Sequence, residues 1–271
     1  MFGIRTSKTS ANLKVSNRSA FTLLEIVVVL AIVALLAGTL IPLSFQFMDA
    51  RREKATRQEI ETIFEGIFGN PEKGSFGYVG DIGALPGSLD DLLTKPGGVS
   101  DFAHHTNDVG YGWRGPYIDT VYSDIKDGWG NAYDLGVVKT GQIRSAGPGG
   151  DFSTTDDNIV FPFVDAASGA VETDGTLLVT AFVNDIPNPS GTTVTVYFAT
   201  NGTEDVTPLS DSTPSDGFKF STHQGIHAVK VTHVSSDTNP ITTTKTVNVP
   251  VVGRRQVSEE IFLRTTGIVS P

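Results

Sequence analysis

An uninterrupted apolar stretch near the N-terminus constrains this chain more than any other feature. No charged residue occurs from Ile26 to Met48, and the centre of the stretch is apolar on every face of a helix. About 20 such residues span the hydrocarbon core of a bilayer, so the stretch predicts a transmembrane helix. A secretory signal also combines basic residues with an apolar run, but a small-residue cleavage site follows it. Residues 40–47 offer no such site, which favours a segment that is retained.

The charge distribution restricts the possible partners. Four of the 20 basic residues lie in the first 20 positions, where there is no acidic residue, and this leaves 16 basic against 30 acidic residues downstream. Nucleic-acid binding needs a basic face, so the acidic body argues against it and fits a cation-binding protein better. The chain has no cysteine, which excludes disulfides, thiolate metal sites and cysteine nucleophiles.

Glu25 is the one residue that does not fit an apolar transmembrane segment. An ionised carboxylate in a bilayer costs about 2.5–3.5 kcal/mol at the helix centre, and less towards the interface. Two interpretations follow from its position alone. The carboxylate extends to the headgroups and favours the helix N-terminus electrostatically, or it pairs with a cation.

The residues around Glu25 resemble the processing site of type IV prepilins and pseudopilins. The segment RSAFTLLE, residues 18–25, follows a basic leader and precedes the apolar run. The resemblance implies that an inner-membrane prepilin peptidase cuts between Ala20 and Phe21 and methylates the new N-terminus. Ala20 stands where the family usually has glycine. The resemblance also implies that Glu25 neutralises the N-terminal ammonium of a neighbouring subunit at Phe21 during filament assembly.

The helix is predicted to continue well beyond the apolar run. Gly38 and Pro42 favour a kink or a melted stretch, because proline removes a backbone donor and crowds the preceding turn. Gly69-Asn70-Pro71 predicts the end of the helix. The part between is amphipathic. Its predicted apolar stripe comprises Ala55, Ile60, Ile63, Phe64, Ile67 and Phe68.

Two aromatic segments further along resemble the W-x-G-P-Y and D-P-W-G-N-P-Y motifs of major pseudopilins of type II secretion. They are GWRGPYI at residues 112–118 and DGWGNAY at residues 127–133, with Gly128 and Ala132 in place of the usual prolines. Tryptophan, tyrosine and glycine at these spacings favour turns with aromatic packing rather than chemistry.

A glycine-bearing loop after these motifs predicts a calcium site. Calcium prefers six to eight oxygen ligands, and residues 145–159 hold three aspartates. The loop lacks the spacing of an EF-hand, and three aspartates on a loop are by themselves more often a solvated turn. It is similar to the calcium loop of major pseudopilins, although Gly149 stands where an aspartate is common. This resemblance implies carboxylate ligands from Asp151, Asp156 and Asp157 and carbonyl ligands from Ser145 and Thr154.

More than a hundred residues follow, and they predict an antiparallel β-sandwich. Short alternating segments are separated by Gly, Pro, Asn, Asp or Ser clusters. Part of this region, at residues 216–231, resembles a transthyretin-like or carboxypeptidase-regulatory-like sandwich. The predicted strands are 177–183, 193–198, 218–220, 227–231, 246–249 and 260–263.

Histidines do not form a convincing metal site in this sequence. His104 and His105 have no supporting spacing, so an exposed loop is the preferred interpretation. His223, His227 and His233 lack a fourth ligand, which favours places at the ends of a core face. The sequence shows neither a nucleophile with a base nor a phosphate loop, so a membrane-anchored hydrolase is disfavoured.

The sequence as a whole predicts an α+β protein. A long N-terminal transmembrane helix packs on a small pilin-type antiparallel sheet, and an all-β Ig-like or transthyretin-like sandwich follows. The predicted parts are a leader at 1–20, the transmembrane and assembly helix at 21–70, a pseudopilin domain at 71–164 and the sandwich at 165–271.

The predicted function is a structural, non-enzymatic subunit of a type IV pilus-like or type II secretion pseudopilus filament. The predicted partners are prepilin peptidase, an assembly platform and other pilin subunits. The predicted location is the inner membrane, with the globular part in the periplasm, and then a filament in the periplasm or at the cell surface. The alternative is a low-abundance tip or minor pilin whose sandwich binds a surface, a glycan or a secreted substrate.

Overall fold

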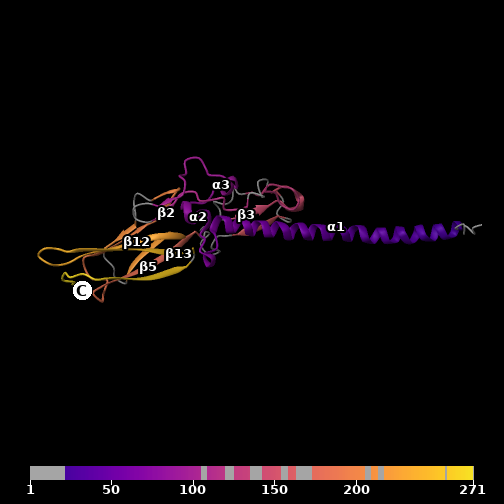
Figure 1. The fold of residues 1–271 in the computed structure, drawn as a ribbon. Helices are drawn as coiled ribbons and strands as arrows, with labels where there is room; N and C mark the ends of the chain where they lie inside the picture. Colours follow the sequence, from indigo (N-terminus) through magenta and orange to yellow (C-terminus); the bar gives the residue numbers. More distant parts are fainter. Residues whose placement is uncertain are drawn as a thin grey trace, which may run out of the picture. The chain divides into compact units, whose positions relative to one another are not determined.

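The structure is a computed structural model in which one long helix precedes a set of short elements and a β-sandwich (Figure 1). Contacts divide the chain into two compact units, residues 1–49 and residues 50–271, and the division falls within the long helix. The structure describes residues 22–104, 109–119, 125–134, 142–153, 158–162, 173–204, 209–212, 217–253 and 255–270.

Helix α1, Leu23–Phe68, is continuous over 46 residues. The predicted helix of residues 21–70 is therefore confirmed to within two residues at each end. Of the predicted kink or melted stretch near Gly38 and Pro42, the melted stretch is not present, because the helical backbone runs through both positions. One proline removes only one backbone donor, and apolar transmembrane helices tolerate this loss. Beyond Pro42, a side chain adds to the backbone hydrogen bonds of the helix, since the Ser44 hydroxyl donates to the Leu40 carbonyl at 2.9 Å.

The end of α1 packs into the core of the first globular part. We call its fully buried side chains the core stripe, and they recur at helical spacing at Thr56, Ile60, Ile63 and Ile67. Phe64 and Phe68 flank the core stripe as predicted. The prediction is wrong at Ala55, which is exposed. Thr56 takes the buried position instead, because its hydroxyl oxygen accepts a backbone hydrogen bond from Gly128.

Short elements built around this helix end form the first globular part. The two β-pairs, β1–β2 and β3–β4, are both antiparallel and separate from each other among the described residues. Apolar side chains of the β3–β4 pair and of the short helices share one core with α1. The elements are η1 (Pro71–Lys73), α2 (Gly77–Ile82), α3 (Asp90–Leu93), β1 (Ala103–His104), β2 (Gly110–Tyr111), β3 (Gln142–Ser145), η4 (Gly147–Gly149) and β4 (Ile159–Pro162).

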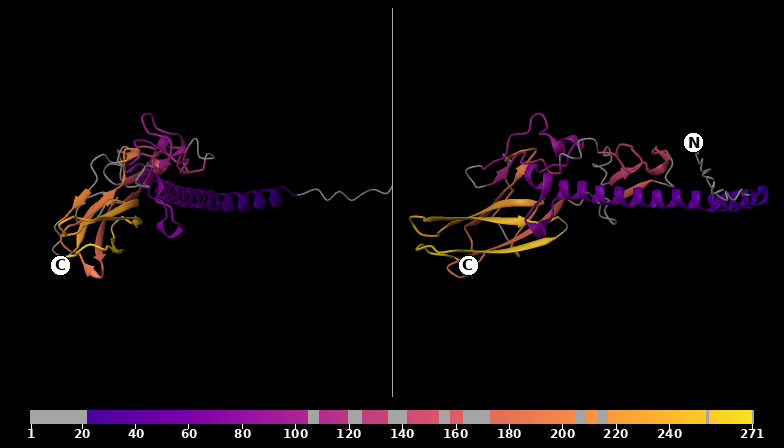
Figure 2. Two further views of the ribbon diagram at one scale, coloured as in Figure 1. Left: turned by 60° about the vertical axis from the view of Figure 1, so that its left-hand side comes forward. Right: turned by 45° about the vertical axis from the view of Figure 1, so that its right-hand side comes forward.

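Ten strands follow β4, and most of them form two sheets (Figure 2). One sheet has the order β10-β7-β12-β13, and the other has the order β11-β5-β14 with β6 paired to β5. Strands β8 and β9 pair with each other. The bounds are β5 (Asp174–Val183), β6 (Ile186–Pro187), β7 (Thr192–Tyr197), β8 (Ala199–Thr200), β9 (Thr203–Glu204), β10 (Leu209–Asp211), β11 (Phe218–His223), β12 (Gly225–Val234), β13 (Thr242–Val251) and β14 (Gln256–Leu263).

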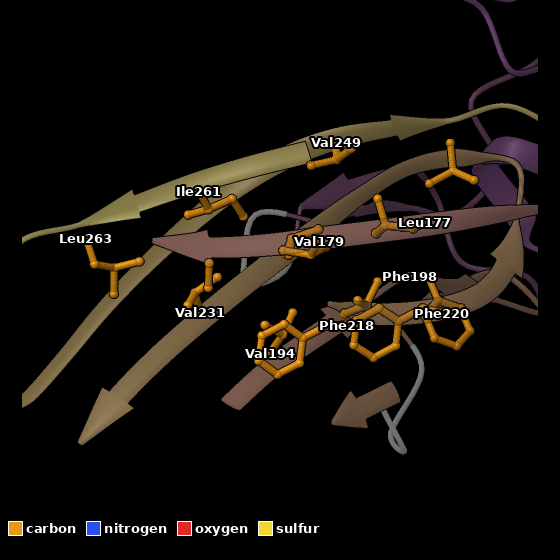
Figure 3. Packing of buried hydrophobic residues seen from close by; sticks show 14 of the residues in the cluster. Leu177, Val179, Val194, Phe198, Phe218, Phe220, Val231, Val249, Ile261 and Leu263 are labelled. Atoms are coloured by element: carbon orange, nitrogen blue, oxygen red, sulfur yellow. The ribbon is translucent and has the colours of Figure 1, made fainter. Parts of the chain in front are cut away.

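A single apolar core joins the two sheets into a sandwich. In Figure 3, Val179 of β5, Val231 of β12 and Phe218 of β11 point towards one another. Strict alternation along β5, with every second side chain buried, puts one face of the strand into this core. The core comprises Leu177, Val179, Ala181, Val183, Val194, Val196, Phe198, Phe218, Phe220, Val229, Val231, Val249, Val251, Ile261 and Leu263. The predicted α+β fold with a β-sandwich is confirmed.

The sequence predicted an antiparallel sandwich, but one pair of strands in the sandwich is parallel. Strand β14 pairs with β5 in parallel, with Gln256 opposite Thr176 and Leu263 opposite Val183. Alternation shows which face of a strand is buried, but it carries no information on the direction of the neighbouring strand. The first and last long strands of the sandwich are therefore neighbours in one sheet.

The sandwich and the first globular part meet through close backbone contacts within the second unit. The Gln224 side chain, 5% exposed, donates to the carbonyls of Phe68 and Phe76 at 2.6 and 3.3 Å. The Gly202 N–H donates to the Ile82 carbonyl at 2.8 Å. Gly83, at φ 72°, lies so close to Ala199 that an added Cβ would be 1.9 Å from the Ala199 carbonyl oxygen. The predicted boundary at residues 164 and 165 lies outside the described residues.

Candidate assembly helix and cation-binding loop

The first half of α1 exposes nearly all of its apolar side chains. Leu23, Leu24 and Leu35 are each at least 72% exposed, and the other large apolar residues up to Met48 are also exposed. A folded, soluble surface rarely shows so large an apolar area, and such areas mark membrane or protein interfaces. By length and composition the helix can cross a membrane. This part of α1 is therefore a candidate surface for lipid and for neighbouring subunits.

The start of α1 contains a helix cap that the sequence analysis missed. Thr22 precedes the helix, and its hydroxyl oxygen accepts the backbone N–H of Glu25 at 3.2 Å. Threonine followed three residues later by glutamate is the signature of a capping box, so the sequence did contain the signal. Among the described residues, no group donates a hydrogen bond to the Glu25 carboxylate or pairs with it. Ala20 and Phe21, the predicted processing residues, lie outside the described part of the chain.

The DGWGNAY segment holds α1 in place. The Thr56 hydroxyl oxygen accepts the Gly128 N–H at 2.9 Å, which explains its burial in the core stripe. The Tyr133 hydroxyl donates to Glu59 Oε2 at 2.6 Å. Burial, followed by the hydrogen bond to Glu59, raises the pKa of Tyr133 well above its usual value. An added Cβ on Gly128 would be 2.6 Å from the Arg52 carbonyl oxygen, so glycine is required for this close approach to the helix.

The GWRGPYI segment surrounds a buried carboxylate. The Arg114 guanidinium donates to both oxygens of Asp81, at 2.6 and 3.1 Å, and stacks over the Phe102 ring at 4.6 Å. The Tyr117 hydroxyl donates to Asp81 at 3.1 Å. Burial raises the pKa of Asp81, although the arginine and the tyrosine act in the opposite direction. With its charge paired and its oxygens occupied, the cluster supports the predicted structural role of the motif.

Asp127 organises the entrance to the predicted calcium loop. Its carboxylate is 4% exposed and accepts the backbone N–H groups of Trp129 and Asn131 at 3.0 and 2.8 Å. It also accepts the Ser145 hydroxyl at 2.7 Å and the Asn131 side-chain amide at 3.3 Å. That amide donates to the Gly147 carbonyl as well. The sequence analysis did not single out Asp127 or Asn131, although an aspartate before glycine favours such turns.

Only part of the predicted calcium ligand set can be located. The Ser145 hydroxyl is occupied, because it donates to Asp127 and accepts the Gly147 N–H at 3.0 Å. Asp151 is exposed, and its Oδ1 accepts the N–H and the hydroxyl of Ser153. Thr154, Asp156 and Asp157 lie outside the described residues. No group of three potential metal-binding side chains is found among the residues that the structure describes.

One further oxygen at this loop lacks a hydrogen bond. Asn158 Oδ1 is buried and accepts no hydrogen bond from the described residues. A buried acceptor without a donor is costly, and an amide oxygen is a suitable calcium ligand. Asn158 directly follows the predicted ligands Asp156 and Asp157 in the sequence. Asn158 is therefore a further candidate ligand for the predicted calcium site, which the sequence did not suggest.

The histidines lie in three different settings. His104 is exposed, and His105 lies outside the described residues. His227 and His233 are buried in β12, whereas His223 in β11 pairs with Asp174 at 2.7 Å. Since β12 supplies the sandwich core, the buried pair occupies a core face, as the sequence suggested.

The described residues thus combine an exposed apolar helix that is long enough to cross a membrane with a globular part packed on the end of that helix. Residues 15–41 match the protein family that is described as the prokaryotic N-terminal methylation motif. Over 127 residues the chain is 28% identical to the type II secretion system core protein G of Xanthomonas campestris pv. campestris. The aligned part covers 47% of this chain and 74% of that protein. Together, the two matches support the predicted resemblance to pilins and pseudopilins. The motif and the apolar helix fit a subunit anchored in the inner membrane.

Proposed function

We propose that this chain is a structural, non-enzymatic subunit that assembles through α1 into a type II secretion pseudopilus or a related filament. The observation that carries the proposal is the exposed apolar half of α1. Its apolar side chains would contact lipid before assembly and neighbouring helices afterwards. Both environments remove the apolar area from water, and this burial stabilises the helix in its surroundings by about 25 cal/mol for each Å².

Processing comes before assembly in this proposal. A prepilin peptidase cuts between Ala20 and Phe21, and an inner-membrane platform then receives the mature subunit. The globular part faces the periplasm. The new ammonium group at Phe21 pairs with Glu25 of a neighbouring subunit. The ammonium is the positively charged partner that Glu25 lacks among the described residues. An unpaired charge in an apolar interior costs several kcal/mol, so this pairing selects one register between subunits.

Glu25→Ala is expected to leave membrane insertion intact and to reduce filament assembly strongly. The alanine removes the carboxylate that the neighbouring ammonium needs, while the apolar helix keeps its length. Carbonate extraction of membranes measures insertion, and filament recovery from cells with the cognate assembly machinery measures assembly. Glu260→Ala is the matched control, because Glu260 is an exposed glutamate in the sandwich. Wild-type filament levels for Glu25→Ala would refute the proposed role.

We also propose that the loop at residues 145–158 binds calcium. Carboxylates from Asp151, Asp156 and Asp157 would hold the ion, with carbonyl oxygens from Ser145 and Thr154. The unpartnered Asn158 Oδ1 favours this assignment. A bound calcium ion would neutralise the loop carboxylates and hold the loop on the β3–β4 pair.

Calcium is expected to raise the melting temperature of the full chain in detergent. A ligand at roughly 100 times its Kd adds about 2.7 kcal/mol of stability, which corresponds to about 5–10 °C for a domain of this size. Asp151→Ala removes a proposed ligand and should abolish the rise, whereas Asp101→Ala, at another exposed aspartate, should preserve it. An unchanged melting temperature with calcium, measured by differential scanning calorimetry, would count against the site.

The tip or minor-pilin alternative makes a different prediction about abundance. A shaft subunit is present in many copies for each filament, whereas a tip subunit whose sandwich binds a surface, a glycan or a secreted substrate is present in few. Quantitative immunoblotting of purified filaments separates these alternatives.

A further inference from the structure

The face of α1 opposite to the core stripe carries two blocks of opposite charge. Successive residues of a helix are rotated by about 100°, so residues 54, 57, 61 and 65 project away from the core stripe. The basic block comprises Arg51, Lys54 and Arg57, and the acidic block comprises Glu61 and Glu65. All five residues are exposed. This helix face is therefore polar and charged, and within the second unit it is not part of the core.

The contacts within the chain leave much of this charge uncompensated. Lys54 and Glu61 form no hydrogen bond or ion pair with another described residue. Arg57 pairs with Glu53 at 2.8 Å, but both side chains are about half exposed. Glu65 lies 4.0 Å from Lys73, also at the surface. Exposed pairs of this kind contribute little to stability, so they leave the blocks free to exchange partners.

The acidic block also borders an open cleft. Glu61 and Glu65 line it together with Glu72 and Arg255, and its volume is about 570 Å³. Among the described lining residues, three carboxylates and one guanidinium give an excess of negative charge. The cleft has room for the long side chain of a lysine or an arginine from another molecule.

We propose that the acidic block of one copy receives the basic block of a second copy that is shifted along the helix axis. Lys54 precedes Glu61 by seven residues, and Arg57 precedes Glu65 by eight. At 1.5 Å for each residue, a shift of about 10–12 Å brings both pairs level at once. The same spacing cannot satisfy both pairs within one helix, because residues seven or eight apart are two turns distant.

A second copy of this chain is the occupant that the charges favour. Its α1 enters the membrane in the same direction, so two helices side by side are parallel and differ only in their axial position. A parallel copy without a shift would place like charges level with each other, which is unfavourable. The charge pattern therefore disfavours copies in register and favours copies that are staggered along the helix axis. This inference rests on the proposed function, since it needs neighbouring α1 helices.

Charge reversal tests the proposed contact in the full chain. Lys54→Glu and Glu61→Lys each place like charges together, and each is expected to lower the recovered filament mass about five-fold or more. The double variant, Lys54→Glu with Glu61→Lys, restores opposite charges between copies and is expected to return to within about two-fold of the wild type. Because both positions are exposed, melting curves of all three variants should match the wild type.

A cysteine pair provides a second measurement, because the natural chain has no cysteine. Lys54→Cys with Glu61→Cys puts two thiols about 10 Å apart along one helix, which is beyond disulfide reach within one molecule. Oxidation of membranes should therefore give disulfide-linked multimers. Lys54→Cys with Glu65→Cys, a pair on the same face that is eleven residues apart and also beyond reach within one molecule, should give about five-fold fewer multimers.

The outcomes separate this inference from the proposed function. If both single variants assemble normally while Glu25→Ala does not, the staggered charge contact is wrong and the filament function stands. If Glu25→Ala also assembles normally, the proposed function fails first. A defect in both single variants that the double variant does not repair would place a different basic partner on the acidic block and overturn the proposal.

Discussion

Asp127→Ala is expected to lower the free energy of unfolding of the full chain by about 3–5 kcal/mol. The carboxylate is buried and accepts four hydrogen bonds, from two backbone N–H groups, the Ser145 hydroxyl and the Asn131 amide. Alanine leaves these donors without that acceptor in a largely buried site. The loss should also release Ser145, at the end of β3, and weaken any calcium binding at the adjoining loop. Urea denaturation in detergent measures the change.

Two variants calibrate this effect. Asp127→Asn keeps the shape and one acceptor oxygen for the backbone N–H groups, and its amide can donate to the Ser145 oxygen, so the expected loss is smaller than for alanine. Asp101→Ala makes the same chemical change at an exposed ion pair with Lys95 and should cost at most about 1 kcal/mol. An Asp127→Ala variant as stable as Asp101→Ala would contradict the role assigned to this carboxylate.

The stability of the sandwich is expected to fall as the pH is lowered from 7 to 5, because His227 is buried without charge. His227 Nε2 lies 2.6 Å from the His223 carbonyl oxygen and therefore donates its proton to it. Nδ1 is buried without a hydrogen-bond partner. Burial lowers the pKa of His227 from 6.5 to about 4. The unfolded chain thus binds a proton in a pH range where the folded chain does not.

The sign and size of the effect follow from this difference in pKa. The stability that neutral His227 provides is complete above pH 6.5 and is lost as the pH falls towards 4. Linkage gives a loss of about 2 kcal/mol between pH 7 and pH 5. Burial also lowers the pKa of His233, which acts in the same direction. The lowered pKa of Asp174 acts below this window, because its ordinary value is 3.8.

His227→Gln isolates the contribution of this histidine. Glutamine does not titrate and still carries an amide donor for the His223 carbonyl, so its pH dependence should be about 2 kcal/mol weaker between pH 7 and pH 5. His104→Gln removes an exposed histidine and should leave the pH dependence unchanged. Urea midpoints at both pH values provide the measurement. An identical pH dependence for His227→Gln and the wild type would show that His227 is charged or solvated in the folded protein.

The long helix and the sandwich strands could be predicted because local patterns determine them. A run without charge from Ile26 to Met48 identifies one helix, and alternation identifies each strand of the sandwich core. The direction and the length of the strands were harder to predict from the sequence. The parallel pairing of β5 with β14 depends on residues more than 70 positions apart, and the predicted strands at 227–231 and 246–249 are only parts of β12 and β13.

The candidate sites show the same limit at the level of single residues. Ala55 was expected in the apolar stripe on hydrophobicity alone, whereas Thr56 is buried because Gly128, 72 positions away, donates to it. The turn around Asp127 has a local signature, but its bond to Ser145 does not. The prediction at Pro42 followed a general rule about proline, and the continuous helix shows that one missing donor does not melt the helix there. The processing residues and all five calcium ligands are still predictions.

The contacts of Gln224, Gly202 and Gly83 have a mechanical consequence. The sandwich is tied to the last carbonyl of α1 at Phe68 and to the last carbonyl of α2 at Ile82. A tensile load applied to the sandwich therefore reaches α1 through several short bonds that are strained together, rather than through a compliant tether. Bonds that share a load in parallel resist rupture better than bonds that open one after another. A force on the sandwich is thus transmitted directly to the C-terminal end of α1.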